Sequence, residues 1–99
     1  MGIFTKLKES LGSPEIDYAE LIVNGAVIVD VRSKAEFETG HAPNSINMPL
    51  QSLGLELKSL KGKTVILVCR SGARAGQAKA LLSSNKITAY NAGRWQKLS

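Results

Sequence analysis

The sequence predicts an α/β protein: a mostly parallel β-sheet with helices on both faces. Two segments rich in apolar residues, at 26–31 and 62–69, have the length and composition of strands that are buried on both sides. Segments with helical spacing separate the predicted strands, and these connections are too long for hairpins but suit helical crossovers. A chain of 99 residues that is 43% hydrophobic and 21% charged is expected to form one globular domain.

The first residues predict an amphipathic helix. In the stretch MGIFTKLKESLG, apolar residues recur at helical spacing with charged residues between them. We expect residues 1–12 to form a helical extension and residues 13–99 to form the domain. The stretch lacks the unbroken apolar run of a signal peptide, and no apolar run in the sequence reaches membrane-spanning length. We therefore expect a cytoplasmic protein that does not bind a membrane.

The next segment predicts a helix, a strand and a second helix. The first helix is expected between Asp17, as its N-cap, and Gly25, as its stop. The first buried strand follows. Ser33 and Glu36 then stand in the S-x-x-E relation of a capping box, which predicts a short helix that ends at Gly40.

The second half of the chain continues the alternation. A loop with a brief strand at 45–47 leads to a helix over 52–60, where leucines recur at helical spacing. The second buried strand leads into an Ala-rich helix over 73–85. A last short strand is predicted at 87–90, before the C-terminal tail. This order of elements is typical of a parallel sheet with helical crossovers.

The stretch VCRSGARAG contains the only cysteine, Cys69, between a predicted strand and a predicted helix. Ligands bind at this end of the strands in parallel sheets. A loop of small residues before a helix lets backbone N–H groups converge on one centre, which stabilises a thiolate. Gly72 permits unusual backbone angles, and Arg70 and Arg74 supply charge for an oxyanion. The alternative is an inert, buried cysteine followed by solvent-facing arginines.

Charge and cysteine count narrow the classes of partner. The net charge of +5 favours anionic partners, but the basic residues are spread along the chain and only 5% of residues are aromatic, so no nucleic acid is expected. A single cysteine excludes an internal disulfide and a cysteine-rich zinc site, and we expect neither a metal nor another cofactor. The tripeptide GKT precedes its strand, and Leu57 stands where a P-loop needs glycine, so ATP binding is not expected.

Six short motifs follow one another along residues 14–95: D-V-R, E-F, G-H-x-P, I-N-x-P, C-x-x-G-x-R and G-x-W. In this combination the chain resembles the single-domain rhodaneses, a family of sulfurtransferases. The resemblance implies a rhodanese-like three-layer α/β/α fold with a central, mostly parallel sheet of about five short strands. It also implies an enzyme in which Cys69 takes a sulfane sulfur from thiosulfate or polysulfide as a persulfide. Cyanide, a thiol or a protein would then accept that sulfur, and we expect the enzyme to be a monomer.

The resemblance assigns roles around Cys69. The loop that binds the small anionic donor is expected to comprise Arg70, Ser71, Gly72, Ala73 and Arg74. The spacing from cysteine to arginine is C-x4-R, one residue shorter than in related phosphatases and arsenate reductases, which favours sulfur over phosphate. Ala75 stands where many relatives have a hydroxyl residue, so one hydrogen bond to the sulfur is expected to be missing.

Residues outside the loop match the family's motifs as well. Asp30, Arg32 and Glu36 are expected to form an ion network near the site, and His41 to be structural rather than a general base. Trp95 and Arg94 are candidates for the walls of the site, and for Trp95 a role in the core is favoured.

One position departs from the family pattern in a turn. Asn44 replaces the usual glycine, and Asn accepts left-handed backbone angles.

Two other functions stay open. One is a rhodanese-like binding module without catalysis, although such modules typically lack the cysteine that this chain has. The other is a sulfur carrier, which uses the same chemistry but serves a dedicated protein partner. Poor turnover with cyanide and fast transfer to a protein would identify the carrier.

Overall fold

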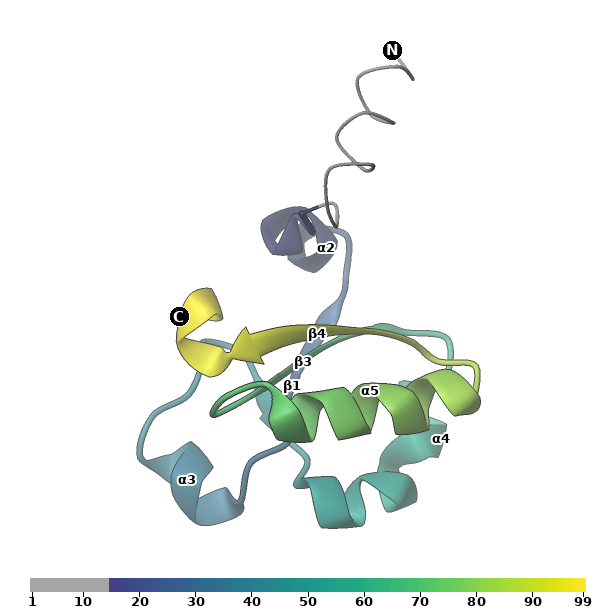
Figure 1. Cartoon of the computed structure of the whole chain (residues 1–99). Helices are drawn as coiled ribbons and strands as arrows, with labels where there is room; N and C mark the ends of the chain where they lie inside the picture. Colours follow the sequence, from purple (N-terminus) through teal and green to yellow (C-terminus); the bar gives the residue numbers. More distant parts are fainter. Residues whose placement is uncertain (1–14) are drawn as a thin grey trace.

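A computed structural model of the protein describes residues 15–99 (Figure 1). The helix that the sequence predicts within residues 1–12 lies outside these residues. The described elements are, in chain order, α2 (Tyr18–Val23), β1 (Val27–Asp30), α3 (Lys34–Glu38), β2 (Ile46–Asn47), the 3-10 helix η1 (Leu50–Glu56), α4 (Leu57–Leu60), β3 (Thr64–Cys69), α5 (Ala73–Ser84), β4 (Thr88–Arg94) and the 3-10 helix η2 (Trp95–Leu98).

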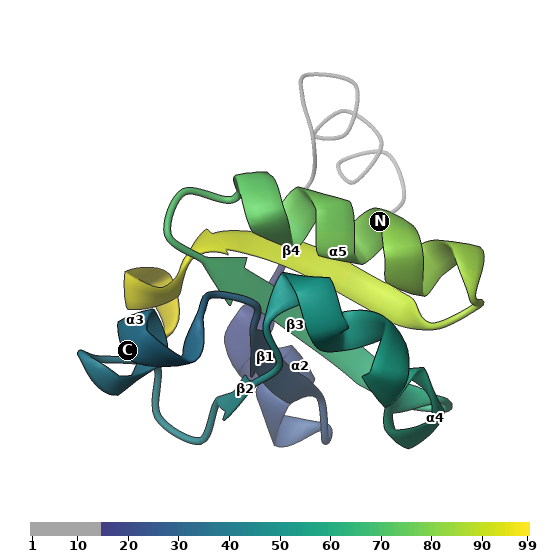
Figure 2. The ribbon, with the colours of Figure 1, turned by 90° about the horizontal axis from the view of Figure 1, so that it is seen from below.

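The strands form one parallel sheet in the order β2-β1-β3-β4 (Figure 2). The two strands predicted to be buried, β1 and β3, lie in the middle of this sheet, in register from Val27 opposite Val65 to Asp30 opposite Val68. The predicted parallel α/β class is therefore confirmed. The described residues form four strands where the resemblance implied about five, and these four are the ones that the sequence pattern indicated segment by segment.

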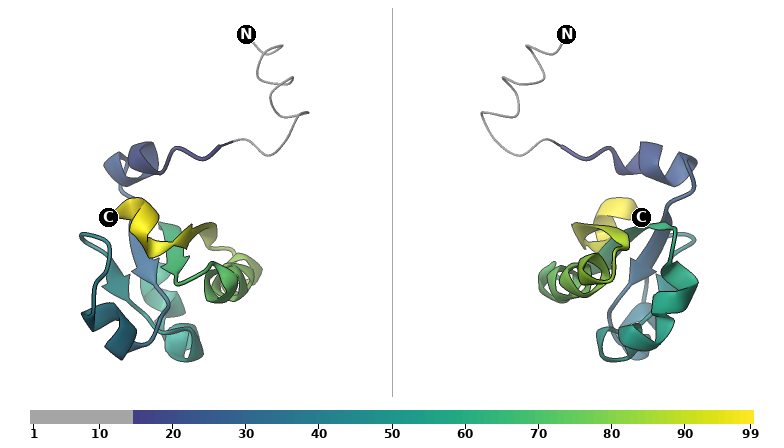
Figure 3. Two further views of the ribbon diagram at one scale, coloured as in Figure 1. Left: turned by 60° about the vertical axis from the view of Figure 1, so that its left-hand side comes forward. Right: turned by 90° about the vertical axis from the view of Figure 1, so that its right-hand side faces the viewer.

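Helices cover both faces of the sheet, which gives three layers (Figure 3). One face packs against η1, α4 and α5 through a cluster of buried side chains that includes Leu53, Leu60, Leu67 and Leu82. The other face packs against α2 and η2 through a smaller cluster of Ile28, Ile66, Val68 and Ala92, with Tyr18, Leu21, Ala26, Trp95 and Leu98 at its border. We call these the α5 face and the α2 face. Burial of both faces explains why β1 and β3 read as apolar runs without alternation.

The predicted caps and turns are present. The Asp17 Oδ1 atom accepts a hydrogen bond from the Glu20 backbone N–H at 3.0 Å, and this bond starts α2. Ser33 and Glu36 form both bonds of the capping box, 3.2 Å from the Glu36 N–H to Ser33 Oγ and 3.0 Å from the Ser33 N–H to Glu36 Oε1. Asn44 has a φ of 64°, the left-handed conformation expected of it.

Two elements differ from the prediction. The segment predicted as a helix over 52–60 is the 3-10 helix η1 followed by a four-residue α4; Pro49 precedes η1 and Gly54, a poor helix former, lies inside it. The strand predicted at 87–90 continues to Arg94. It does so through a β-bulge, because Leu67 lies opposite Asn91 whereas Val68 lies opposite Gly93.

No helix among residues 15–99 is long and apolar enough to cross a membrane.

Candidate active site

Cys69 is the last residue of β3, at the carboxyl end of the central strands. Residues 70–72 form the loop that follows, and α5 begins at Ala73. The Cys69 side chain is fully buried and belongs to the cluster on the α5 face. The strand–loop–helix arrangement that the sequence predicts around the cysteine is therefore present.

Two backbone N–H groups point at the sulfur. The Gly72 N–H lies 2.9 Å from Cys69 Sγ and the Ala75 N–H lies 3.4 Å from it. Gly72 has φ 102° and ψ −13°, left-handed angles that a side chain would strain, and it is the N-cap residue of α5. The donors are thus one loop amide and one amide of the first helical turn, and both favour negative charge on the sulfur.

Arg74 forms a bidentate ion pair with Glu36. Its Nη1 lies 2.7 Å from Oε1 and its Nη2 lies 3.0 Å from Oε2, and the two side chains are 34% and 32% exposed. The hydrogen bonds from Arg74, and after them that from the backbone of Ser33, hold the pKa of Glu36 well below its ordinary value. The same contact raises the pKa of Arg74. The charge of Arg74 is therefore balanced by Glu36, while Arg70 is exposed in the loop.

Asp30 and Arg32 form a second ion pair, which is buried. The Arg32 Nε lies 2.9 Å from Asp30 Oδ1 and its Nη2 lies 2.7 Å from Oδ2, with side chains only 5% and 0% exposed for Arg32 and Asp30. Arg32 also donates to the carbonyls of Gly40, at 2.7 Å, and of Glu36, at 3.3 Å. This pair therefore ties the end of β1 to the middle of α3 and to Gly40, which follows that helix.

His41 and Trp95 lie away from the sulfur. The His41 Nδ1 is 2.8 Å from the carbonyl oxygen of Phe37, and the two rings stack with centroids 3.7 Å apart. Trp95 packs at the border of the α2 face, on the other side of the sheet from Cys69, and its ring centroid lies 5.0 Å from the guanidinium carbon of Arg32. Trp95 is thus part of the second core cluster.

The structure adds Asn91, which the sequence analysis did not single out. Its Nδ2 donates to the carbonyl oxygen of Gly72 at 3.0 Å, and its Oδ1 accepts from the Gly93 N–H at 2.9 Å. Asn91 follows the strand predicted at 87–90, and the end of that strand lies beside Cys69 in a parallel sheet. This place after the strand is the one feature of the sequence that indicates a position of Asn91 near Cys69.

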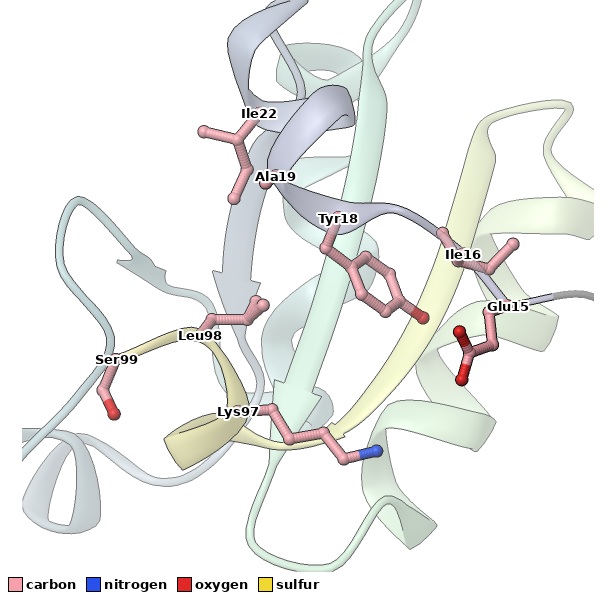
Figure 4. Close-up of a pocket in the computed structure, with 8 residues that line it drawn as sticks. All are labelled: Glu15, Ile16, Tyr18, Ala19, Ile22, Lys97, Leu98 and Ser99. Atoms are coloured by element: carbon pink, nitrogen blue, oxygen red, sulfur yellow. The ribbon is translucent and has the colours of Figure 1, made fainter.

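A pocket of about 670 Å³ lies between α2 and η2, on the α2 face (Figure 4). Its walls include Tyr18, Ile22 and Leu98. Tyr18 and Leu98 border the cluster on the α2 face, so the sheet separates this pocket from Cys69. Among residues 15–99, no three His, Cys, Asp or Glu side chains come together in a way that suits a metal ion.

Known proteins resemble this chain over most of its length. A tRNA sulfurtransferase from Thermoplasma acidophilum is 39% identical over 70 residues, which are 70% of this chain and 14% of that protein. A sulfurtransferase from Allochromatium vinosum is 35% identical over 57 residues, which are 57% of this chain and 53% of that protein. The chain thus spans about half of one relative and a small part of the other.

A solved structure of a rhodanese with anions from E. coli superposes with a TM-score of 0.69 at 26% identity, and the match covers 76% of this chain and 93% of that one. The Rhodanese-like domain family matches residues 6–96, a range that begins inside the predicted N-terminal extension. With the cysteine loop at the end of β3 and this match over nearly the whole chain, the protein belongs to the rhodanese-like domain family.

Proposed function

We propose that the protein is a sulfurtransferase that carries a sulfane sulfur on Cys69. The observation that carries the proposal is the pair of backbone N–H groups directed at Cys69 Sγ. A neutral thiol gains little from two such donors because its sulfur is a weak acceptor, whereas a thiolate or a persulfide anion gains charge-assisted hydrogen bonds. Membership of the family and the two relatives named sulfurtransferases support the same activity.

The reaction has two half-reactions, both at sulfur. In the first, the Cys69 thiolate attacks the outer sulfur of thiosulfate; the new S–S bond forms as the old one breaks, and sulfite leaves with the electron pair. With a polysulfide donor, the leaving group is a shorter polysulfide. In the second, the acceptor attacks the terminal sulfur of the persulfide and restores the thiolate. Double displacement of this kind gives ping-pong kinetics.

Charge near the loop supports an anionic donor. Arg70 is exposed directly after Cys69. Arg94 is exposed at the end of β4 and lies opposite Cys69 in the register, so its Cβ is on the same face of the sheet as the sulfur. Glu36 balances the charge of Arg74, which leaves Arg70 and Arg94 as the exposed arginines that adjoin Cys69, one in the sequence and the other in the strand register.

The acceptor is external to the chain. Cys69 is the only cysteine of the chain, so no second thiol is present here to take the outer sulfur as a persulfide of its own or to release it as hydrosulfide by forming an internal disulfide. Cyanide, a small thiol and a protein are the acceptor classes that we propose. Fast transfer to a protein combined with poor turnover with cyanide would make the molecule a sulfur carrier.

The test is the intact mass of the purified protein before and after incubation with thiosulfate or polysulfide. We expect a gain of about 32 Da, one sulfur atom, which cyanide removes and which the Cys69→Ser variant never shows. A gain with polysulfide alone would keep the mechanism and change the donor. A folded wild-type protein that gains no mass with either donor would refute the proposal and favour a binding module.

A further inference from the structure

We propose that Asn91 is a positioning residue for the sulfur chemistry: its side-chain amide holds Gly72 in the conformation that directs the Gly72 N–H at Cys69 Sγ. The inference rests on the proposed function of Cys69. Asn91 itself makes no contact with the sulfur among the hydrogen bonds of the described residues, so it acts through the loop.

The Gly72 carbonyl oxygen has two hydrogen-bond donors, one from Asn91 and one from Gly76. This oxygen accepts a hydrogen bond from Asn91 Nδ2 at 3.0 Å and another from the Gly76 backbone N–H at 2.9 Å. On the other side of the same residue, the Gly72 N–H points at Cys69 Sγ at 2.9 Å. The contacts that Cys69 and Asn91 make therefore lie on either side of one α-carbon, and they restrain the two peptide groups that flank it.

Gly72 needs such a restraint because it is glycine. Its φ of 102° is accessible only to a residue without a side chain, but glycine also reaches many other conformations at little cost. A change in the backbone torsions on either side of these peptide groups would turn the Gly72 N–H away from the sulfur. A second partner on the carbonyl makes that rotation unfavourable, because it would leave the Asn91 amide without an acceptor in a partly buried place.

The Asn91 side chain is itself fixed. Its Oδ1 accepts from the Gly93 N–H at 2.9 Å, a turn across the β-bulge, and the Tyr18 hydroxyl donates to its backbone carbonyl at 3.4 Å. The amide lies against two glycines at ordinary contact distances: a Cβ on Gly76 would lie 3.5 Å from Asn91 Nδ2, and one on Gly72 would lie 3.8 Å from Oδ1. An amide held at both ends in this way positions its neighbour without reorganisation.

Asn85 offers a matched control. Its Nδ2 donates to the carbonyl oxygen of Leu81 at 2.9 Å, and the contact is also partly buried, but it lies at the far end of the same helix α5. Replacement of either asparagine by serine removes one amide-to-carbonyl hydrogen bond of the same kind. Serine at position 91 still accepts from the Gly93 N–H, as hydroxyls do in short turns, but is too short to reach Gly72.

The experiment compares wild type, Asn91→Ser and Asn85→Ser in two measurements. The first is the ultraviolet absorbance of the thiolate at neutral pH, which reports on Cys69 alone because the chain has one cysteine. The second is the rate of sulfur loading followed by intact mass. We expect Asn91→Ser to lower the thiolate absorbance and to slow loading about tenfold, the size of a weakened hydrogen bond to a charged group. Asn85→Ser should match the wild type in both.

Equal behaviour of the two variants would overturn the inference, and so would a wild-type protein without thiolate absorbance. If the wild type shows thiolate absorbance but loads no sulfur, the proposed function fails, and the absorbance comparison still decides the role of Asn91. Should Asn91→Ser fail to fold, Asn91→Asp keeps the size of the side chain and replaces its donor by an acceptor. That variant is measured at low and high salt, because salt screens an added charge but does not restore a missing donor.

Discussion

Burial determines what an ion pair contributes to this fold, and the two pairs near the site allow a direct comparison. We predict that Asp30→Asn is strongly destabilising while Glu36→Gln is not. Each substitution removes one negative charge, keeps the shape of the side chain and leaves an arginine without its partner. The Asp30–Arg32 side chains are 0% and 5% exposed, whereas Glu36 and Arg74 are each about one third exposed.

The magnitude for Asp30→Asn follows from what remains buried. Asparagine still accepts from the Arg32 backbone N–H, as Asp30 Oδ1 does at 3.0 Å, but it cannot accept both arms of the guanidinium. The charge of Arg32 is then buried beside neutral oxygens only, those of the asparagine amide and of two backbone carbonyls, with no carboxylate to balance it. Removal of one partner of a buried ion pair costs about 3–5 kcal/mol. A domain of this size has about 5–15 kcal/mol of stability in total.

The assay is urea unfolding of wild type, Asp30→Asn and Glu36→Gln, with circular dichroism as the signal and thermal melts in parallel. At roughly 4–8 °C per kcal/mol, Asp30→Asn should lower Tm by more than about 10 °C, and Glu36→Gln should lower it far less. If the two variants lose similar free energies of unfolding, burial of the Asp30–Arg32 pair does not have the weight that we assign to it.

Three further outcomes follow from the contacts described above. Gly76→Ala should stabilise the protein by about 0.5–1 kcal/mol in urea unfolding, because alanine favours the helix more than glycine does. Its Cβ would lie 3.5 Å from Asn91 Nδ2, an ordinary contact distance. A destabilised variant would show that the space beside Gly76 is needed. Because Arg74 lowers the pKa of Glu36, the stability from this pair should be complete above the ordinary pKa of 4.5 and be lost progressively as the pH falls below it toward the lowered pKa of the folded state. The Glu36→Gln variant should not lose this part of its stability in acid. If the free energy of unfolding falls equally in acid for the wild type and the variant, the assignment is contradicted. Arg94→Ala should slow sulfur loading from thiosulfate, and the difference from the wild type should shrink as salt is added. Lys79→Ala removes an exposed charge in the middle of α5 and should leave the loading rate unchanged. Equal loading rates of the two variants would exclude Arg94 from donor binding.

Local signals were sufficient for most of the fold. The apolar runs of β1 and β3 identify strands that are buried on both faces, and the capping box at Ser33 is complete within four residues. The tight winding of η1 and the extension of β4 to Arg94 were not predicted. Both depend on packing: Leu53 and Leu60 reach the core from a segment interrupted by Gly54, and the end of β4 is a strand because β3 pairs with it.

Within the candidate site too, features that are local in the sequence could be predicted, whereas contacts between distant segments could not. The loop after Cys69 could be predicted because its glycine, its arginines and its position between strand and helix are contiguous in sequence. The partner of Arg74 could not, because Glu36 lies 38 residues away and already has a local role as a cap. Asn91 lies 19 residues from Gly72, and a single polar residue after a strand carries no sign of the carbonyl that it will bind.

The bulge in β4 has a consequence beyond the site. Among residues 15–99, β4 and β2 are the outer strands of the sheet, and an outer strand exposes unpaired backbone groups on which another chain can add a strand. β2 has two residues and offers little such surface, but β4 has seven. The extra residue between Leu67–Asn91 and Val68–Gly93 bends β4 and interrupts its regular spacing of donors and acceptors. The bulge that follows Asn91 therefore also makes the long edge of the described sheet a poorer template for the addition of another strand.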